Sequence, residues 1–117
     1  MKHILMIPLL LAFPAYADAP VVKDVGLSQS GTSWTISVTL SHPDTGWDHY
    51  ADGWEVLDAD GNSLGIRVLG HPHVNEQPFT RSLGSVDIPS GTAFISIRAR
   101  DNIDGWFDGL FRVDLPG

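Results

Sequence analysis

The sequence predicts an all-β protein built as a single antiparallel β-sandwich of seven strands. Short runs in which apolar and polar residues alternate recur along the chain, which is typical of strands with one buried face. The 117 residues include 12 glycines and 8 prolines, and many of these, with aspartates, separate the runs as turns. No long window has the 3.6-residue apolar period of an amphipathic helix.

Residues 1–17 have the pattern of a secretory signal peptide. Lys2 and His3 precede a compact apolar run at 4–13, and Ala15-Tyr16-Ala17 has the small-x-small form of a cleavage site. The apolar run is about half as long as a membrane-spanning helix. We expect cleavage after Ala17, a periplasmic or secreted location, one domain at 18–117 and no membrane insertion of that domain. Because the chain has no cysteine, we expect no lipid anchor.

The first half of the domain gives the clearest strand signal at Ser33–Leu40. Its apolar residues alternate with hydroxyl residues, so one face is apolar and the other polar. Asp60-Gly61 is a strong signal for a tight hairpin turn. The four strands expected in this half are residues 21–27, 33–40, 52–57 and 63–69.

The second half is expected to contain three more strands. The apolar phase changes near Gly84, which indicates a β-bulge. Farther on, Ile95, Ile97 and Ala99 are predicted to point inward, and Arg98 and Arg100 outward. The strands expected in this half are residues 79–88, 93–100 and 110–115.

Two features resemble immunoglobulin-like and fibronectin-III-like domains. Trp54 stands where such folds carry a buried tryptophan on their third strand, and 88–100 resembles the late part of fibronectin-III-like domains. The paired segments HPDTGWDHYADGW (42–54) and HPHVNEQPFTR (71–81) also resemble those of small exported proteobacterial proteins of uncharacterised function. That resemblance covers most of the domain and implies no particular activity.

Strand direction predicts where the polar loops lie. If consecutive strands run up and down, the loops at 41–51, 70–78 and 101–109 all fall at one end of the sandwich. These three loops contain every histidine of 18–117 and many of its aspartates. Binding sites on sandwiches are commonly built from loops at one end.

The four histidines of 18–117 predict a transition-metal site. His71 and His73 are two residues apart, so in an extended segment their side chains face the same side, and Pro72 favours extended geometry at His71. The domain has no cysteine or methionine, so imidazole and carboxylate are its ligands, and these suit copper or zinc. We expect His71, His73, His42 and His49 as ligands, in that order. Alternatively, His42 continues the inward phase of its strand and closes the core, and His49 packs or caps.

Other side chains in the three loops are candidate ligand contacts. Glu76 could orient a histidine or be a solvated acid, and Arg81 could bind an anion or pair with Glu76. The aromatic residues could stack on a sugar or a peptide, or fold inward and hold the loops. Without a metal, these loop residues could bind a protein or a glycan, so the alternative function is a protein- or glycan-interaction module. The candidates are Glu76, Arg81, Trp47, Tyr50, Asp48 and Trp106.

Charge and missing motifs limit the function further. Removal of 1–17 takes away Lys2 and leaves all fourteen acidic residues, so the net charge moves from −7 to near −8. This charge disfavours nucleic acid and favours a metal ion or a basic periplasmic partner protein. The acidic loop at 101–108 does not match the twelve-residue calcium loop, so calcium is expected less than copper or zinc. We expect no enzyme, because no nucleophile or phosphate-binding motif is present.

Overall fold

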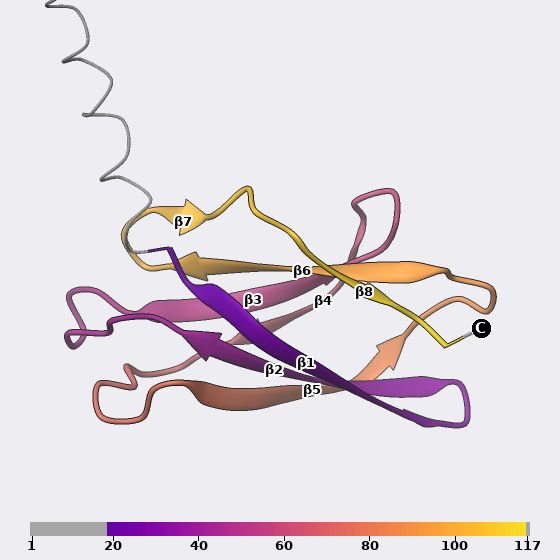
Figure 1. Cartoon of the computed structure of the whole chain (residues 1–117), viewed down its shortest axis with the longest axis horizontal. Helices are drawn as coiled ribbons and strands as arrows, with labels where there is room; N and C mark the ends of the chain where they lie inside the picture. Colours follow the sequence, from indigo (N-terminus) through magenta and orange to yellow (C-terminus); the bar gives the residue numbers. More distant parts are fainter. Residues whose placement is uncertain (1–18, 117) are drawn as a thin grey trace, which may run out of the picture.

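The computed structural model describes residues 19–116. The expected signal peptide at 1–17 lies outside these residues. Within them the protein is all-β and antiparallel, which confirms the predicted class of fold (Figure 1). No helix among the described residues is long and apolar enough to span a membrane. The strands are β1 (Val21–Ser30), β2 (Ser33–Ser41), β3 (Ala51–Leu57), β4 (Ser63–Val68), β5 (Phe79–Asp87), β6 (Phe94–Asp101), β7 (Gly105–Trp106) and β8 (Phe111–Asp114).

The strands form two sheets. One has the order β1-β2-β5, and the other has the order β4-β3-β6-β7, with β8 also paired to β6. All seven expected strands are present, and β7 is an additional strand inside the loop expected at 101–109. Gly105 has a φ of 76°, which lets the chain reverse, so that Trp106 pairs with Arg100. Two residues are too few to show an apolar period, so the sequence gives no sign of this strand.

The bulge expected near Gly84 is present in β5. Trp34 pairs with Val86 and Ile36 pairs with Leu83, so two residues of β5 lie opposite one residue of β2. The left-handed backbone conformation is at Ser85, with a φ of 57°, and not at Gly84. The bulge changes which residues of β5 face inward, and it thereby explains the change in apolar phase.

The core lies between the two sheets. Alternating residues of β2, β3 and β6 point into it, and Trp54 is fully buried there, as expected from its place on the third strand. Arg98 and Arg100 lie on the opposite face of β6, where they pair with Glu55 and Asp52. The largest fully buried apolar side chains are Trp54, Phe79, Ile36, Leu40, Ile95 and Ile97.

Three loops meet at one end of the sandwich, as strand direction predicts. The loops are the β2–β3 loop (42–50), the β4–β5 loop (69–78) and the β6–β7 turn (102–104), all at the left in Figure 1. Asn102 joins the first of these loops to the third. Its Oδ1 accepts a hydrogen bond from the Tyr50 N–H at 2.8 Å, and its Nδ2 donates to the Trp47 carbonyl at 3.1 Å.

Candidate metal centre

His42 enters the site from the end of β2. It follows the inward phase of Ile36, Val38 and Leu40, so its ring lies at the end of the core and is 1% exposed. Its backbone N–H donates to the Gln77 side chain at 2.9 Å. The expectation that His42 closes the core is therefore correct, and the same position also points its ring toward other polar groups.

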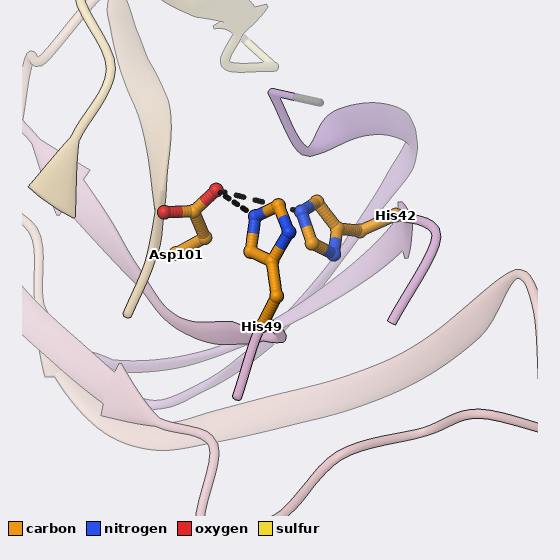
Figure 2. A group of neighbouring side chains, drawn as sticks. All are labelled: His42, His49 and Asp101. Atoms are coloured by element: carbon orange, nitrogen blue, oxygen red, sulfur yellow. Dashed lines mark hydrogen bonds and ion pairs between the residues drawn. The ribbon is translucent and has the colours of Figure 1, made fainter. Parts of the chain in front are cut away.

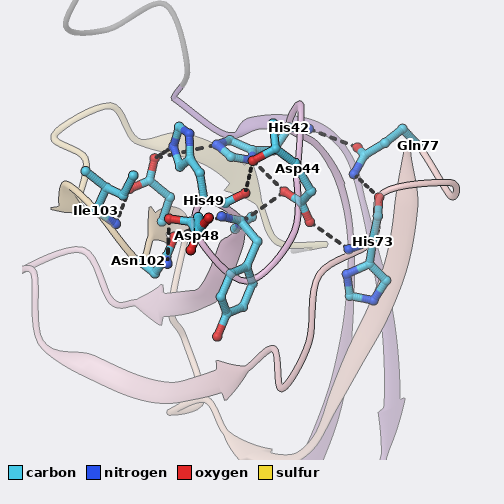
Figure 3. A network of polar contacts seen from close by, with 12 residues as sticks. His42, Asp44, Asp48, His49, His73, Gln77, Asn102 and Ile103 are labelled. Atoms are coloured by element: carbon cyan, nitrogen blue, oxygen red, sulfur yellow. Dashed lines mark hydrogen bonds and ion pairs between the residues drawn. The ribbon is translucent and has the colours of Figure 1, made fainter.

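Asp44 holds the His42 ring and joins two loops (Figure 3). Its Oδ1 accepts from His42 Nδ1 at 2.5 Å and from the Ala51 N–H at 3.0 Å. Its Oδ2 accepts from the His73 N–H at 2.8 Å. Because the carboxylate accepts from Nδ1, the proton of a neutral His42 lies on Nδ1 and the lone pair lies on Nε2. Orientation of a metal-binding histidine by a carboxylate on its other nitrogen is a common arrangement in proteins.

Asp101 faces His42 from the end of β6. It follows the inward phase of Ile95, Ile97 and Ala99, and it is fully buried. Its Oδ1 accepts from the backbone N–H groups of the two residues Ile103 and Asp104, at 3.0 and 2.7 Å.

The hydrogen bonds to Asp101 outweigh the cost of its burial. Burial by itself raises the pKa of this carboxyl, but the N–H of Asp104 and the His49 side chain lower it more, and the net pKa lies below its ordinary value. An ionised, buried carboxylate therefore lies beside His42 and His49.

His49 completes the group, and in the view of Figure 2 its ring lies between the Asp101 carboxylate and the His42 ring. Its Nε2 lies 2.9 Å from Asp101 Oδ2, and His42 Nε2 lies 3.5 Å from the same oxygen. The two imidazole rings meet edge to face, with centroids 4.9 Å apart. The His49 side chain is 19% exposed, whereas those of His42 and Asp101 are fully covered. His49 is therefore the member of the group that solvent reaches.

The three side chains offer two imidazole nitrogens and one carboxylate oxygen within 4.8 Å of one another. Two ligands that each lie about 2.1 Å from one tetrahedral ion are about 3.4 Å apart. The separation of 3.5 Å between His42 Nε2 and Asp101 Oδ2 fits this value. His42 Nε2 is also buried without a hydrogen-bond partner. Buried nitrogens usually have a partner, so this atom is well suited to bind an ion.

The structure brings together two of the four histidines expected as ligands. His42 and His49 belong to the group, and His71 and His73 do not. His71 is exposed. The His73 ring is buried and stacks on Phe79, with centroids 3.9 Å apart. Figure 3 shows the His73 ring lying apart from the His42–His49 pair, although its backbone N–H reaches Asp44. The group therefore contains the third and fourth of the expected ligands and does not contain the first two.

Sequence reasoning missed Asp44 and Asp101 as site residues. A signal for Asp101 exists, because it is the next inward position after Ile95, Ile97 and Ala99 on a buried strand. His42 occupies the equivalent position after β2. Both are polar residues that continue the inward phase at the end of a strand, Asp101 as the last residue of β6 and His42 as the first residue after β2. Asp44 has no such signal, because its position depends on how the β2–β3 loop folds.

Glu76 and Arg81 form an exposed ion pair, with Oε1 and Nη2 3.0 Å apart. This matches the expectation of a surface pair. Hydrogen bonding to Arg81 lowers the pKa of Glu76, against a smaller opposing effect of desolvation. In the structure this carboxylate accepts a hydrogen bond from Arg81 Nη2.

The aromatic candidates occupy two different places. Trp47 is 66% exposed, and its indole meets the Tyr50 ring edge to face, with centroids 5.6 Å apart. Trp106 lies on the outer face of the second sheet, over the guanidinium groups of Arg98 and Arg100. Asp48 is exposed, and its carbonyl accepts from Asn102 Nδ2. The three aromatics therefore do not form one platform.

Comparisons with known proteins give one relative and one similar fold. No family model matches the chain. A protein of Halomicrobium mukohataei named "Putative lipoprotein" is 43% identical over 97 residues, which are 83% of this chain and 47% of that protein. The chain therefore spans about half the length of this relative. The crystal structure of a hypothetical protein from Pyrococcus horikoshii OT3 matches with a TM-score of 0.53 and 16% identity, over 84% of this chain and 88% of the other. This second likeness concerns the fold alone.

Proposed function

We propose that the protein is an exported binding domain that holds one divalent transition-metal ion through His42, His49 and Asp101. The observation that carries the proposal is the convergence of two imidazole nitrogens and a buried carboxylate within 4.8 Å. Three protein ligands leave a fourth position for water or for a partner's ligand. The role is binding, for delivery or storage of the metal, and it includes no catalytic step.

The donor set suits borderline metals. Copper and zinc remain the leading ions, since both bind imidazole and carboxylate. Two histidines with one carboxylate are also a set that binds Fe(II), so iron belongs in the same test. His49 Nε2 lies 2.9 Å from Asp101 Oδ2, so an ion bound between the ligands would replace this contact. Protons compete with a metal ion for imidazole nitrogens and carboxylate oxygens, so binding should weaken as the pH falls.

Export is part of the proposal. The signal-like pattern at 1–17 supports it, and so does the name of the Halomicrobium relative, which describes that protein as a lipoprotein. The relative is about twice as long as the aligned region, so its activity and partners do not transfer to this chain directly.

The test is calorimetric titration of the metal-free protein with Zn(II), Cu(II) and, without oxygen, Fe(II). We expect one ion bound at this group with a Kd below about 10 µM. His49→Ala is the informative variant, because its side chain is partly exposed and its loss disturbs the core least. Asp101→Asn is the second variant, and Asn75→Ala, an exposed loop residue outside the group, is the control. If His49→Ala and Asp101→Asn both bind all three ions with the affinity of the wild-type protein, the proposed centre is disproved.

A second candidate function rests on the exposure of Trp47. An indole that is 66% exposed beside a second aromatic ring is unusual for a purely structural residue and is suited to contact a protein or a glycan. A partner captured in the presence of chelator, and lost in Trp47→Ala, would support this function. Capture that requires a metal would count against it.

A further inference from the structure

A groove of about 570 Å³ separates the β2–β3 loop from the β4–β5 loop. Trp47 lines one side of it, and His71, His73 and Glu76 line the other. We propose that His71 and His73 form a second transition-metal site in this groove, distinct from the His42–His49–Asp101 group. The site takes a borderline divalent cation, and Cu(II) fits best because it binds imidazole most strongly among the divalent first-row ions.

The His71 ring is already in the form that binds a metal. Its Nδ1 lies 2.9 Å from the Pro72 carbonyl oxygen. A carbonyl can only accept a hydrogen bond, so Nδ1 carries the proton and Nε2 carries the lone pair. A histidine that binds a metal through one nitrogen commonly donates the other N–H to a backbone carbonyl. The residue is also exposed, so an ion can reach it from solvent.

The His73 ring is buried and lacks a hydrogen-bond partner at either nitrogen. The residue is held in place by its backbone, because its N–H donates to Asp44 and its carbonyl accepts from Gln77 Nε2 at 2.8 Å. Its ring is held by the Phe79 stack. A neutral imidazole has one nitrogen with a free lone pair in either tautomer, and here that lone pair is unused.

The two rings are close enough to share one ion. Their centroids are 4.6 Å apart. An imidazole bound at about 2.1 Å places its ring centre about 3.2 Å from the ion, so two rings on one ion have centres about 4.5 to 5.2 Å apart at bond angles between about 90° and about 110°. The observed separation falls in this range. The ion can complete its coordination with water in the open groove.

The experiment is Cu(II) titration of the metal-free protein, followed by calorimetry and by tryptophan emission. We expect two ions per protein, with quenching of Trp47, which lines the groove. His71→Ala should lower the stoichiometry from two to one and should remove the quenching. Trp47→Phe should remove most of the quenching and leave two ions bound. Asn75→Ala, another residue that lines the groove, is the control and should behave as the wild type.

The two proposed sites can be disproved independently of each other. His71 is exposed, so His71→Ala should fold normally, and circular dichroism with thermal unfolding checks this. An unchanged stoichiometry and affinity in His71→Ala would overturn the groove site and leave the His42–His49–Asp101 centre intact. Loss of all binding in His71→Ala, with no change in His49→Ala, would support the groove site and overturn the buried centre. Electron paramagnetic resonance of the His49→Ala protein should show nitrogen coupling at the remaining Cu(II), and spectra without it would also overturn the groove site.

Discussion

His42 and His73 are both buried histidines at the same end of the sandwich, yet their surroundings differ. The His42 ring has a carboxylate on Nδ1 and faces two further ligand groups. The His73 ring stacks on Phe79, and neither of its nitrogens has a partner. One carboxylate, Asp44, contacts both residues, but it binds the ring of His42 and only the backbone of His73. Burial alone therefore does not define a ligand, and the polar groups around the ring decide its chemistry.

The largest effect is expected from Asp44→Ala. This change leaves the N–H groups of Ala51 and His73 and the Nδ1 of His42 without their acceptor. Buried donors without partners are costly, so we expect the free energy of unfolding to fall by about 3 kcal/mol. Urea unfolding measures this. Asp58→Ala is a matched control, because Asp58 accepts two backbone N–H bonds in an exposed turn and should matter far less. Equal losses in the two variants would show that Asp44 does not join the two histidine regions.

Metal binding should stabilise the His42 region specifically. A ligand at 100 times its Kd raises the free energy of unfolding by about 2.7 kcal/mol. We expect this gain with Zn(II) in the wild type, and we expect Asp101→Asn to lose most of it. Thermal unfolding with and without chelator provides the measurement. A full gain in Asp101→Asn would mean that the stabilising ion binds elsewhere.

Replacement of His73 by phenylalanine tests the other half of the comparison. His73→Phe keeps the stack on Phe79 and removes two buried nitrogens that lack partners. At pH 7.5 without metal, we expect stability to stay equal or to rise by roughly 1 kcal/mol. A fall in the free energy of unfolding of well over about 1 kcal/mol would show that the nitrogens have a structural role in the metal-free protein.

The same variant gives a pH test. Burial, Arg81 and His71 lower the pKa of His73 below its ordinary value of 6.5. Between that depressed pKa and 6.5 the unfolded chain binds more protons than the folded one, so stability falls as the pH falls below 6.5. Urea unfolding in the presence of chelator should therefore show that the free energy of unfolding falls more steeply from pH 7.5 to pH 5 in the wild type than in His73→Phe. Parallel curves would contradict the depressed pKa.

The smallest effect is expected from Glu76→Gln. The pair with Arg81 is exposed, and exposed pairs add little stability. The urea midpoint should not change measurably in 0.15 M salt. A clear shift would mean that Glu76 acts on the groove histidines in addition to Arg81.

Local pattern determined the fold class, the strands and the end of the sandwich where the histidines lie. Buried and more exposed side chains alternate in β2 and β6 because a strand has a two-residue period. Consecutive strands run in opposite directions because the connections between them are short. The inward phase also places His42, and in retrospect Asp101, at the end of the core. These are consequences of local geometry, so one sequence is enough to derive them.

Tertiary structure decided which polar groups meet. His71 and His73 form the denser motif in the sequence, yet the group of three ligands consists of His42, His49 and Asp101, whose first and last members are 59 positions apart. Loop conformation sets this choice. Asp44 holds the His42 ring and bonds the backbone of His73 in a second loop, and the turn after β6 holds the Asp101 carboxylate, which bonds the His49 ring. Such contacts depend on side chains from different loops at once, and no local pattern in the sequence specifies them.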